Sequence, residues 1–181
     1  MTNEALAALA RQYGFDETGL IPVSELEFSQ EIRRICETGC RGYGKSWACP
    51  PAVGTVEECR ARCGQFERML LLSARFELED SFDYEGMTAG MREFRNRVER
   101  FGGALRPLLP TFLLLSNEGC GRCAACTYPD APCRQPQRMY HSIEGYGFNV
   151  SELARRAGVK YNNGPNTVTF FGALLFGDKN A

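Results

Sequence analysis

Residues 69–78 read MLLLSARFEL, and this stretch decides the fold. Its first half is a continuous apolar run, which is typical of a central strand buried on both faces. A long amphipathic helix is predicted after it, with an apolar stripe made of Met87, Met91, Phe94, Val98, Phe101 and Leu105. Residues 111–116 form a second apolar run, so residues 69–116 are predicted to make a right-handed βαβ unit.

Shorter elements are predicted on both sides of this unit from apolar periodicity and from capping residues. They are a helix over residues 3–13, an extended segment over 15–23, a helix that starts at the capping box Thr55–Glu58, a helix over 150–157 that starts at the capping-box pattern Asn149–Glu152, and a strand over 168–176. Residues 25–44 give an ambiguous pattern. The expected fold is α/β (α+β), with a mixed sheet of about four strands flanked by helices and two cysteine-rich cluster-binding loop regions.

The amino-acid composition excludes several classes of binding protein and of metal site. The 181 residues contain nine cysteines, one histidine and a formal net charge of −1. This balance does not indicate a binder of nucleic acid or of membrane surfaces, and one histidine excludes zinc sites built from two or three. The chain shows no signal-peptide pattern and no apolar run that could span a membrane, so we expect a cytoplasmic protein. In a reducing compartment, clustered cysteines more often bind metal than form disulfides.

The second half of the chain carries the clearer cysteine pattern. Cys120, Cys123 and Cys126 form a C-x2-C-x2-C run, and Cys133 follows after six residues. Each two-residue spacer can turn the backbone around one iron–sulfur cube, as in bacterial ferredoxins. Structural zinc usually takes two CxxC pairs separated by a longer loop, so zinc and free thiols are the weaker alternatives. The run follows the strand 111–116 directly, at the kind of strand end where α/β proteins bind ligands.

The first half of the chain carries a less familiar pattern. Cys36, Cys40 and Cys49 are separated by three and by eight residues. Glycines near Cys40 allow backbone N–H groups to approach sulfur, and Pro50 and Pro51 fix the chain direction directly after Cys49. Residues 33–63 also contain six basic and three acidic side chains, which would partly offset the negative charge of a buried cluster. These features favour a second metal site.

The fourth ligand of this first site has two candidates. Cys59 and Cys63 lie one turn apart on the apolar face of the helix that starts at Thr55, so either could complete the site. We take Cys59 as the ligand and Cys63 as a small hydrophobic core residue.

Three other patterns are predicted to be structural. Residues 39–46 match the P-loop pattern G-x4-G-K-S/T, but that motif needs a strand before it and a helix after it, and Pro50 and Pro51 prevent the helix. The arginine-rich back of the helix that follows residue 84 is interleaved with Glu93 and Glu99, as expected of a solvated face. The single histidine, His141, lacks a paired carboxylate pattern and is expected to pack rather than catalyse.

Both cysteine blocks resemble a prokaryotic family of predicted metal-binding proteins. The likeness rests on Cys36-x3-Cys40, residues 43–51 (YGKSWACPP) with Glu57-Glu58-Cys59, and Cys120-x2-Cys123-x2-Cys126 with Ala131-Pro132-Cys133-Arg134, Pro136 and Ser142-Ile143-Glu144. It implies metal binding, and Cys63 lies outside its pattern. Residues 13–22 are also similar to the opening of corrinoid-dependent reductases that carry two 4Fe-4S clusters, such as epoxyqueuosine reductase.

These observations predict one iron–sulfur-binding domain over residues 1–181 that holds two 4Fe-4S clusters. Its expected ligands are Cys36, Cys40, Cys49 and Cys59 for one cluster, and Cys120, Cys123, Cys126 and Cys133 for the other. The first functional hypothesis is electron transfer to a partner redox enzyme in anaerobic metabolism. The alternatives are a redox enzyme or corrinoid-linked accessory factor that uses one cluster catalytically, and a structural zinc module. The patterns leave open whether the protein is an enzyme and what its oligomeric state is.

Overall fold

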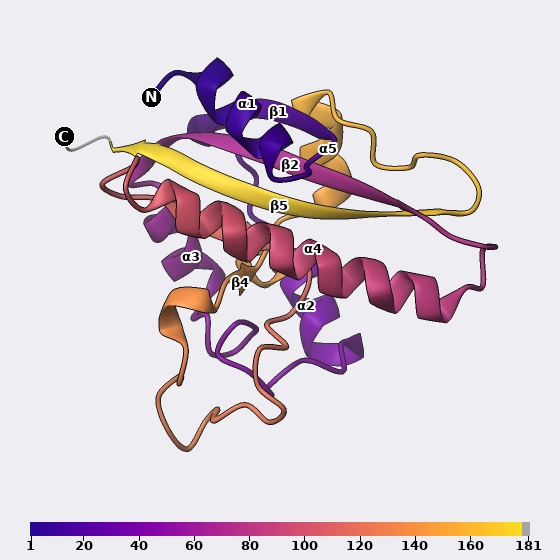
Figure 1. The fold of residues 1–181 in the computed structure, drawn as a ribbon. Helices are drawn as coiled ribbons and strands as arrows, with labels where there is room; N and C mark the ends of the chain where they lie inside the picture. The colour runs from indigo at the N-terminus through magenta and orange to yellow at the C-terminus, as the bar shows by residue number, and fades with distance from the viewer. Residues whose placement is uncertain (179–181) are drawn as a thin grey trace.

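The computed structural model describes residues 1–178, which form one mixed sheet flanked by helices (Figure 1). The five strands lie in the order β1-β2-β5-β3-β4. Their bounds are β1 Glu17–Pro22, β2 Phe66–Glu77, β3 Leu113–Ser116, β4 His141–Ser142 and β5 Thr167–Asp178. This confirms the predicted α+β class. The prediction of about four strands omitted β4, because two residues leave no periodic signal.

Strands β2 and β5 form the centre of the sheet. They pair antiparallel along their length, with Leu71 opposite Ala173. Residues 69–74 of β2 are all buried, because helices cover both faces of the sheet at this point. Met69 and Leu71 enter the core on one face, while Leu70 and Leu72 enter the core on the other. The continuous apolar run therefore does mark a central strand.

The βαβ unit predicted over residues 69–116 is present, but another strand is inserted between its two strands. Both β2 and β3 run antiparallel to β5, so they run parallel to each other, with helix α4 (Tyr84–Leu105) connecting them. β5 lies between them in the sheet. A strand from the end of the chain can occupy this place because β5 is itself apolar on both faces, with Phe171 and Leu175 on one side and Leu174 on the other.

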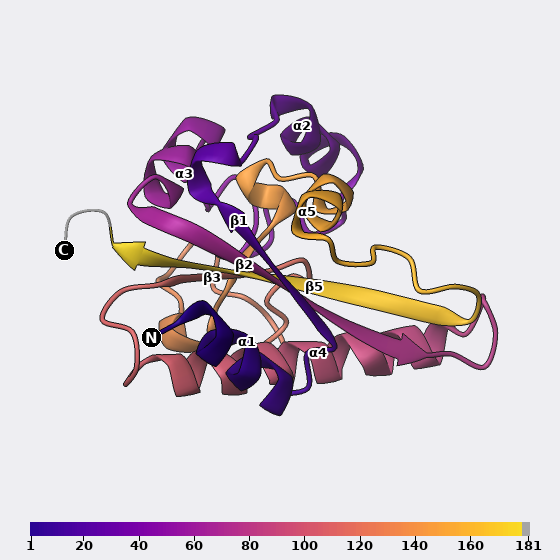
Figure 2. The same cartoon turned by 90° about the horizontal axis from the view of Figure 1, so that it is seen from above.

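The helices form two layers on opposite faces of the sheet (Figure 2). Helix α1 (Asn3–Gln12) and α4 cover one face. The other face carries α2 (Gln30–Gly39), α3 (Val56–Cys63) and α5 (Val150–Ala157). Three short 3-10 helices complete the structure: η1 (Val23–Glu25), η2 (Pro136–Arg138) and η3 (Glu144–Tyr146). Both cysteine-containing loops extend below the sheet in Figure 1.

Helix α4 packs through the predicted apolar stripe. Phe94, Val98 and Phe101 are at most 1% exposed and join the core on the α1 side. Phe15, directly after α1, contacts Phe94 edge-on with ring centroids 6.0 Å apart. Burying three such side chains contributes roughly 5–8 kcal/mol of transfer free energy, so α4 forms a fixed base for the loop that follows β3.

Local capping explains most helix ends. Thr55 and Glu58 form the predicted capping box at the start of α3. Asn149 caps α5 as predicted, but Glu152 pairs with Arg155 and Arg156 rather than completing a second box. The ambiguous residues 25–44 contain α2, whose first turn is capped by the Ser29 hydroxyl.

Candidate metal centre

The second cysteine group lies in the long loop between β3 and β4. Asn117 fixes the start of this loop, since its backbone N–H donates to the Phe171 carbonyl and its side-chain Oδ1 accepts from the Phe171 N–H, both at 2.9 Å. All four predicted ligands line one cavity in this loop: Cys120, Cys123, Cys126 and Cys133. The structure therefore brings this predicted set together at the end of a strand.

Backbone N–H groups point at sulfur in a repeated pattern. The residue two positions after the cysteine donates its N–H to Sγ at Cys40 and Cys133, each at 3.4 Å, and the same contact occurs at Cys120 and Cys126. The side-chain amide of Gln135 adds a donor to Cys123 Sγ at 3.5 Å. Hydrogen bonds of this kind stabilise thiolates and tune the potential of clusters that they ligate.

Cys126 shows the strongest effect of these donors. Desolvation tends to raise the pKa of its thiol, but the backbone N–H groups of Tyr128, Trp47 and Thr127, together with the charge of Arg134, overcome it and lower the pKa. The thiol is exposed and free of a disulfide. A thiol of this kind ionises readily, and the thiolate is the form that binds metal.

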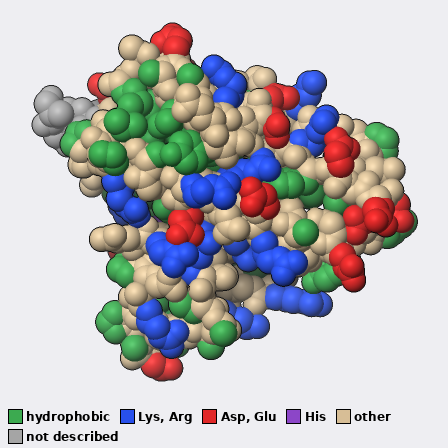
Figure 3. All heavy atoms as spheres, viewed as in Figure 1, with side chains coloured by type: hydrophobic (Ala, Val, Ile, Leu, Met, Phe, Trp, Pro, Cys, Tyr) green, Lys and Arg blue, Asp and Glu red, His purple; other side chains and the backbone are tan. Residues whose placement is uncertain are grey.

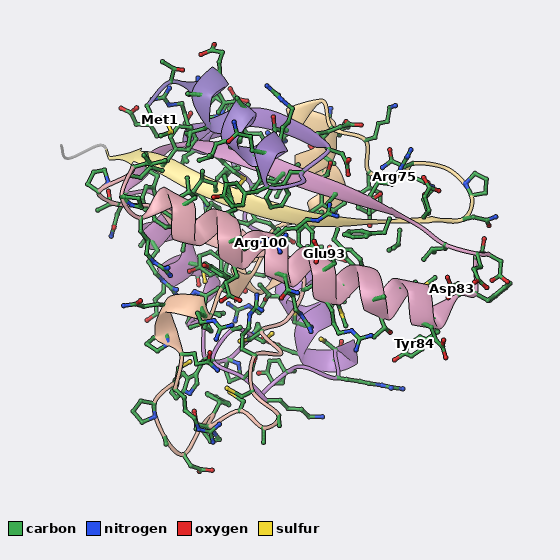
Figure 4. All side chains as sticks on the ribbon, in the orientation of Figure 1. Met1, Arg75, Asp83, Tyr84, Glu93 and Arg100 are labelled. Carbon is green, nitrogen blue, oxygen red and sulfur yellow. The ribbon has the colours of Figure 1, made fainter. Side chains whose placement is uncertain are left out.

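Helix α4 holds this loop by ion pairs. Glu99 pairs with Arg122 at 2.8 Å, between Cys120 and Cys123, and with Arg138, which follows Cys133. Arg95 lies 3.9 Å from Glu118, which precedes Cys120. The predicted solvated face therefore has a second role, because part of it anchors the loop. Glu93 and Arg100 lie on its outer side (Figure 4), paired at 3.2 Å.

The first cysteine group is assembled from separate elements. Cys36 lies on α2, Cys40 is the residue that caps the end of α2, and Cys49 lies in the turns that follow. A Cβ atom at Gly42 would lie 3.6 Å from Cys40 Sγ and 4.0 Å from Cys49 Sγ, so these two sulfurs surround this glycine. Burial, with the nearby charges of Glu144 and Cys40, raises the pKa of Cys36 to about 11.

Glu144 is a member of this site that the sequence patterns did not single out as a ligand. It begins η3, and its charge acts on both Cys36 and Cys49. Burial raises the pKa of its carboxyl group to about 7, against the effect of a hydrogen bond from its own N–H. The available signal was its place in the Ser142–Glu144 stretch that the chain shares with the family.

Cys59 lies apart from these three in its contacts. Its thiol is fully buried and donates to the Val53 carbonyl at 3.5 Å. Arg33 Nη2 at 3.8 Å and Arg62 Nη2 at 3.6 Å donate to its sulfur. Cys63 is also fully buried, and burial together with the neighbouring Cys59 raises its pKa to about 12. Sequence reasoning counted both arginines as general positive charge and missed their contact with Cys59.

The two cysteine groups are neighbours. The Trp47 backbone N–H donates to Cys126, and its indole Nε1 donates to the Ala131 carbonyl at 3.1 Å, so this residue of the first block is fixed to the second loop. Cys49 follows two residues later. From the other side, a Cβ at Gly119 would lie 3.8 Å from Cys49 Sγ. The chain thus connects the two groups at two places.

The surroundings fit negatively charged clusters. Each cysteine group has a buried guanidinium nitrogen beside it that lacks a hydrogen-bond partner among the described residues. They are Nε of Arg33 beside the first group and Nε of Arg95 beside the second. A buried donor without an acceptor is costly, and cluster sulfur is an acceptor. Within residues 1–178, no three Cys, His, Asp or Glu side chains are grouped as ligands of a single metal ion. The second-group cysteines line one cavity.

A larger cavity of about 400 Å³ adjoins the second group. Cys133, Trp47 and Met139 line it, together with His141. His141 Nδ1 lies 2.9 Å from the Tyr146 hydroxyl, and burial lowers the pKa of its ring to about 4. The histidine is therefore neutral at pH 7 and held by an aromatic partner.

The fold and the thiol groups together define a cysteine-rich α+β protein of metal-binding type. The chain belongs to the family described as predicted metal-binding protein (DUF2284), whose model matches residues 19–176. This confirms the family expected from the sequence. No curated protein and no solved structure matches the chain. Across residues 1–178, every helix is too short or too polar to cross a bilayer.

Proposed function

We propose that the protein holds two 4Fe-4S clusters and transfers electrons between them and a partner redox protein. The observation that carries this proposal is the direct connection of the two cysteine groups through Trp47 and Gly119. Electron transfer slows steeply with distance, so neighbouring clusters within one small protein form an efficient path. The clusters supply one-electron redox chemistry, and the protein supplies burial, thiolates and hydrogen bonds that set their potentials.

Cys120, Cys123, Cys126 and Cys133 would hold the second cluster. The N–H groups directed at Cys120, Cys126 and Cys133 favour the ionised thiolates that iron requires. Cys36, Cys40 and Cys49 would hold three positions of the first cluster, and Cys59 is the fourth ligand expected from the sequence.

The partner is expected to be acidic where it meets this protein. Lys and Arg side chains gather over the middle of the face shown in Figure 3, on α4 and on the loops below it. Arg134 adds positive charge beside the second group, since its guanidinium donates to the carbonyl of Ala125, between Cys123 and Cys126. Complementary charge would accelerate association, and added salt would slow it. The reduction rate by an acidic ferredoxin, measured at increasing salt, tests this expectation.

Metal analysis of protein prepared without oxygen tests the central claim. Two clusters predict about eight irons and about eight sulfides per chain with broad visible absorption. About two zinc ions, no sulfide and no colour would support a structural zinc module and overturn the proposal. Partial reduction followed by electron paramagnetic resonance then shows whether the two clusters are magnetically coupled, as neighbours should be.

The cavity beside Cys133 favours a second function, a redox enzyme or corrinoid-linked factor. Its volume of about 400 Å³ falls within the range of small-molecule sites, and its walls are mainly apolar. A substrate or corrinoid bound there would lie next to the second cluster. Titration with cobalamin, followed by absorbance, tests this function against the carrier function. Binding that is lost when the cavity residue Met139 is replaced by Trp would favour the enzyme.

A further inference from the structure

We propose that Glu144, in place of Cys59, is the fourth ligand of the first cluster, beside Cys36, Cys40 and Cys49. This inference rests on the proposed function, in which that group holds a 4Fe-4S cluster. It makes the two clusters chemically different, because one has four thiolates and the other has three thiolates and a carboxylate.

The backbone places Glu144 directly beside Cys49. The Ser142 backbone N–H donates to the Ala48 carbonyl at 2.8 Å, and a Cβ at Gly145 would lie 3.1 Å from Pro50 Cδ. Residues on both sides of Glu144 are thus fixed to residues on both sides of Cys49.

The same segment is fixed to the helix that carries Cys36. Helix α2 contacts η3, the short helix that Glu144 begins. At its end, the Gly147 carbonyl accepts the Ser29 N–H at 2.8 Å, and Ser29 caps the start of α2. Glu144 therefore lies where two of the three thiols meet, and its charge acts on both of them.

The carboxylate of Glu144 is free to bind. Within residues 1–178, the only hydrogen bond to it comes from its own backbone N–H, and it forms no ion pair. Two partly buried carboxylates beside the second group do have basic partners, Glu99 in Arg122 and Glu118 in Arg95. A largely buried, unpaired carboxyl group beside the thiols of Cys36 and Cys49 has the position of a ligand rather than of a structural ion pair.

Cys59, in contrast, already has a complete set of contacts. Its S–H donates to the Val53 carbonyl, and Arg62 bridges the same carbonyl and the sulfur. Arg33 in turn joins the Gly54 carbonyl, at 2.6 Å, to this sulfur. These contacts hold residues 53–54 and α3 together, which is a structural role that needs no metal.

Four variants of the full-length protein, loaded without oxygen, test the assignment. Glu144→Gln replaces a carboxylate by a weaker amide ligand, and Glu152→Gln makes the same change at a partly exposed site on α5, away from the cysteines. Cys59→Ala removes the rival ligand, and Cys63→Ala is its matched buried control. The measurements are iron content before and after mild oxidation, electron paramagnetic resonance, and circular dichroism as a check of folding.

Glu144→Gln should lose one iron from the first cluster on oxidation, so that about eight irons become about seven and a 3Fe-4S signal appears. Glu152→Gln, Cys59→Ala and Cys63→Ala should match the wild type. A folded Cys59→Ala variant that loses about half of its iron overturns the inference, and so does a Glu144→Gln variant with unchanged iron and spectra. If Cys59→Ala does not fold, Cys59→Ser is assessed by the same criteria. Failure of the proposed function is a different result: wild-type protein that holds zinc, or a single cluster.

Discussion

The two cysteine groups bring their thiols together in different ways. The second is contained in one loop, its four thiols line one cavity, and its sulfurs receive local backbone N–H groups. The first draws its thiols from the end of α2 and from the turns before α3, and it depends on η3, which is far away in the sequence. The loop site follows from local spacing, whereas the other site exists only once the sheet and both helices have packed.

This difference predicts different sensitivities. A loop site should fail when a ligand or its anchor to α4 is lost, with little effect on the rest of the fold. A site built from packed elements should fail when the packing of α2, α3 or η3 is weakened, even by changes that touch no sulfur.

The largest expected effect comes from replacing one cysteine in each group. Cys123→Ser and Cys40→Ser should each lose about half of the iron, because each removes one cluster and leaves the other. Iron and sulfide analysis with absorbance checks this outcome. Loss of all iron in either variant would show that the groups depend on each other and would break the comparison.

A smaller effect is expected from the anchor of the loop site. Glu99→Gln removes the charge that holds Arg122 and Arg138, which should weaken the attachment of the loop by about 1–2 kcal/mol. Hydrogen exchange should then increase in residues 117–140 and remain unchanged in α2 and α3. Equal exchange in both regions would contradict the independence of the two sites.

The reverse experiment weakens the packed site. Thr55→Ala removes the cap of α3 and should reduce the free energy of unfolding by about 1 kcal/mol. Denaturant unfolding measures this change. The first cluster should also release iron to a chelator faster, while the second releases it at the wild-type rate, since its loop has no contact with this cap.

The smallest effect on stability and iron release is expected from an ion-pair variant on α4, which serves as the control. Glu93→Gln removes two ion pairs on α4, one to the partly buried Arg97 and one to the exposed Arg100. Such pairs contribute about 0–1 kcal/mol, so the midpoint of thermal unfolding and both iron-release rates should stay close to the wild type. A marked loss from the loop site would mean that the whole charged face of α4 supports it.

The sequence allowed prediction of those elements whose signals are local. The apolar run at residues 69–72, the stripe of α4 and the capping box at Thr55 each predicted an element that the structure contains. Helix α2 was ambiguous because it inverts the usual pattern, with Arg33 buried at 6% exposure and Ile35 exposed at 60%. A periodicity of apolar residues cannot identify a helix that buries a charge.

The site residues also divide into those that local sequence patterns predict and those that only the folded structure brings together. Spacing alone predicted that the four thiols of the loop lie together, and they line one cavity, because a loop arrangement is encoded by neighbours in the sequence. The surroundings of the first group could not be predicted, since Glu144 reaches it through the pairing of β4 with β3 and through contacts of the folded chain with Ala48 and Ser29. The contacts of Arg62 with Cys59 and Tyr146 likewise depend on the packing of α3 against η3. Whether the predicted ligand Cys59 binds metal is a question for the variants above.

The central position of β5 also has a consequence for biosynthesis. The strand that lies between β2 and β3 is made of residues 167–178, which leave the ribosome after all nine cysteines. Until then the sheet lacks its middle, so the supports of both cysteine groups are incomplete. The nascent chain therefore exposes its thiols to oxidants and to competing metals for most of its synthesis. On the proposed function, the clusters would be loaded after translation, and the cell's assembly machinery and thiol reductants would then act as part of the folding pathway.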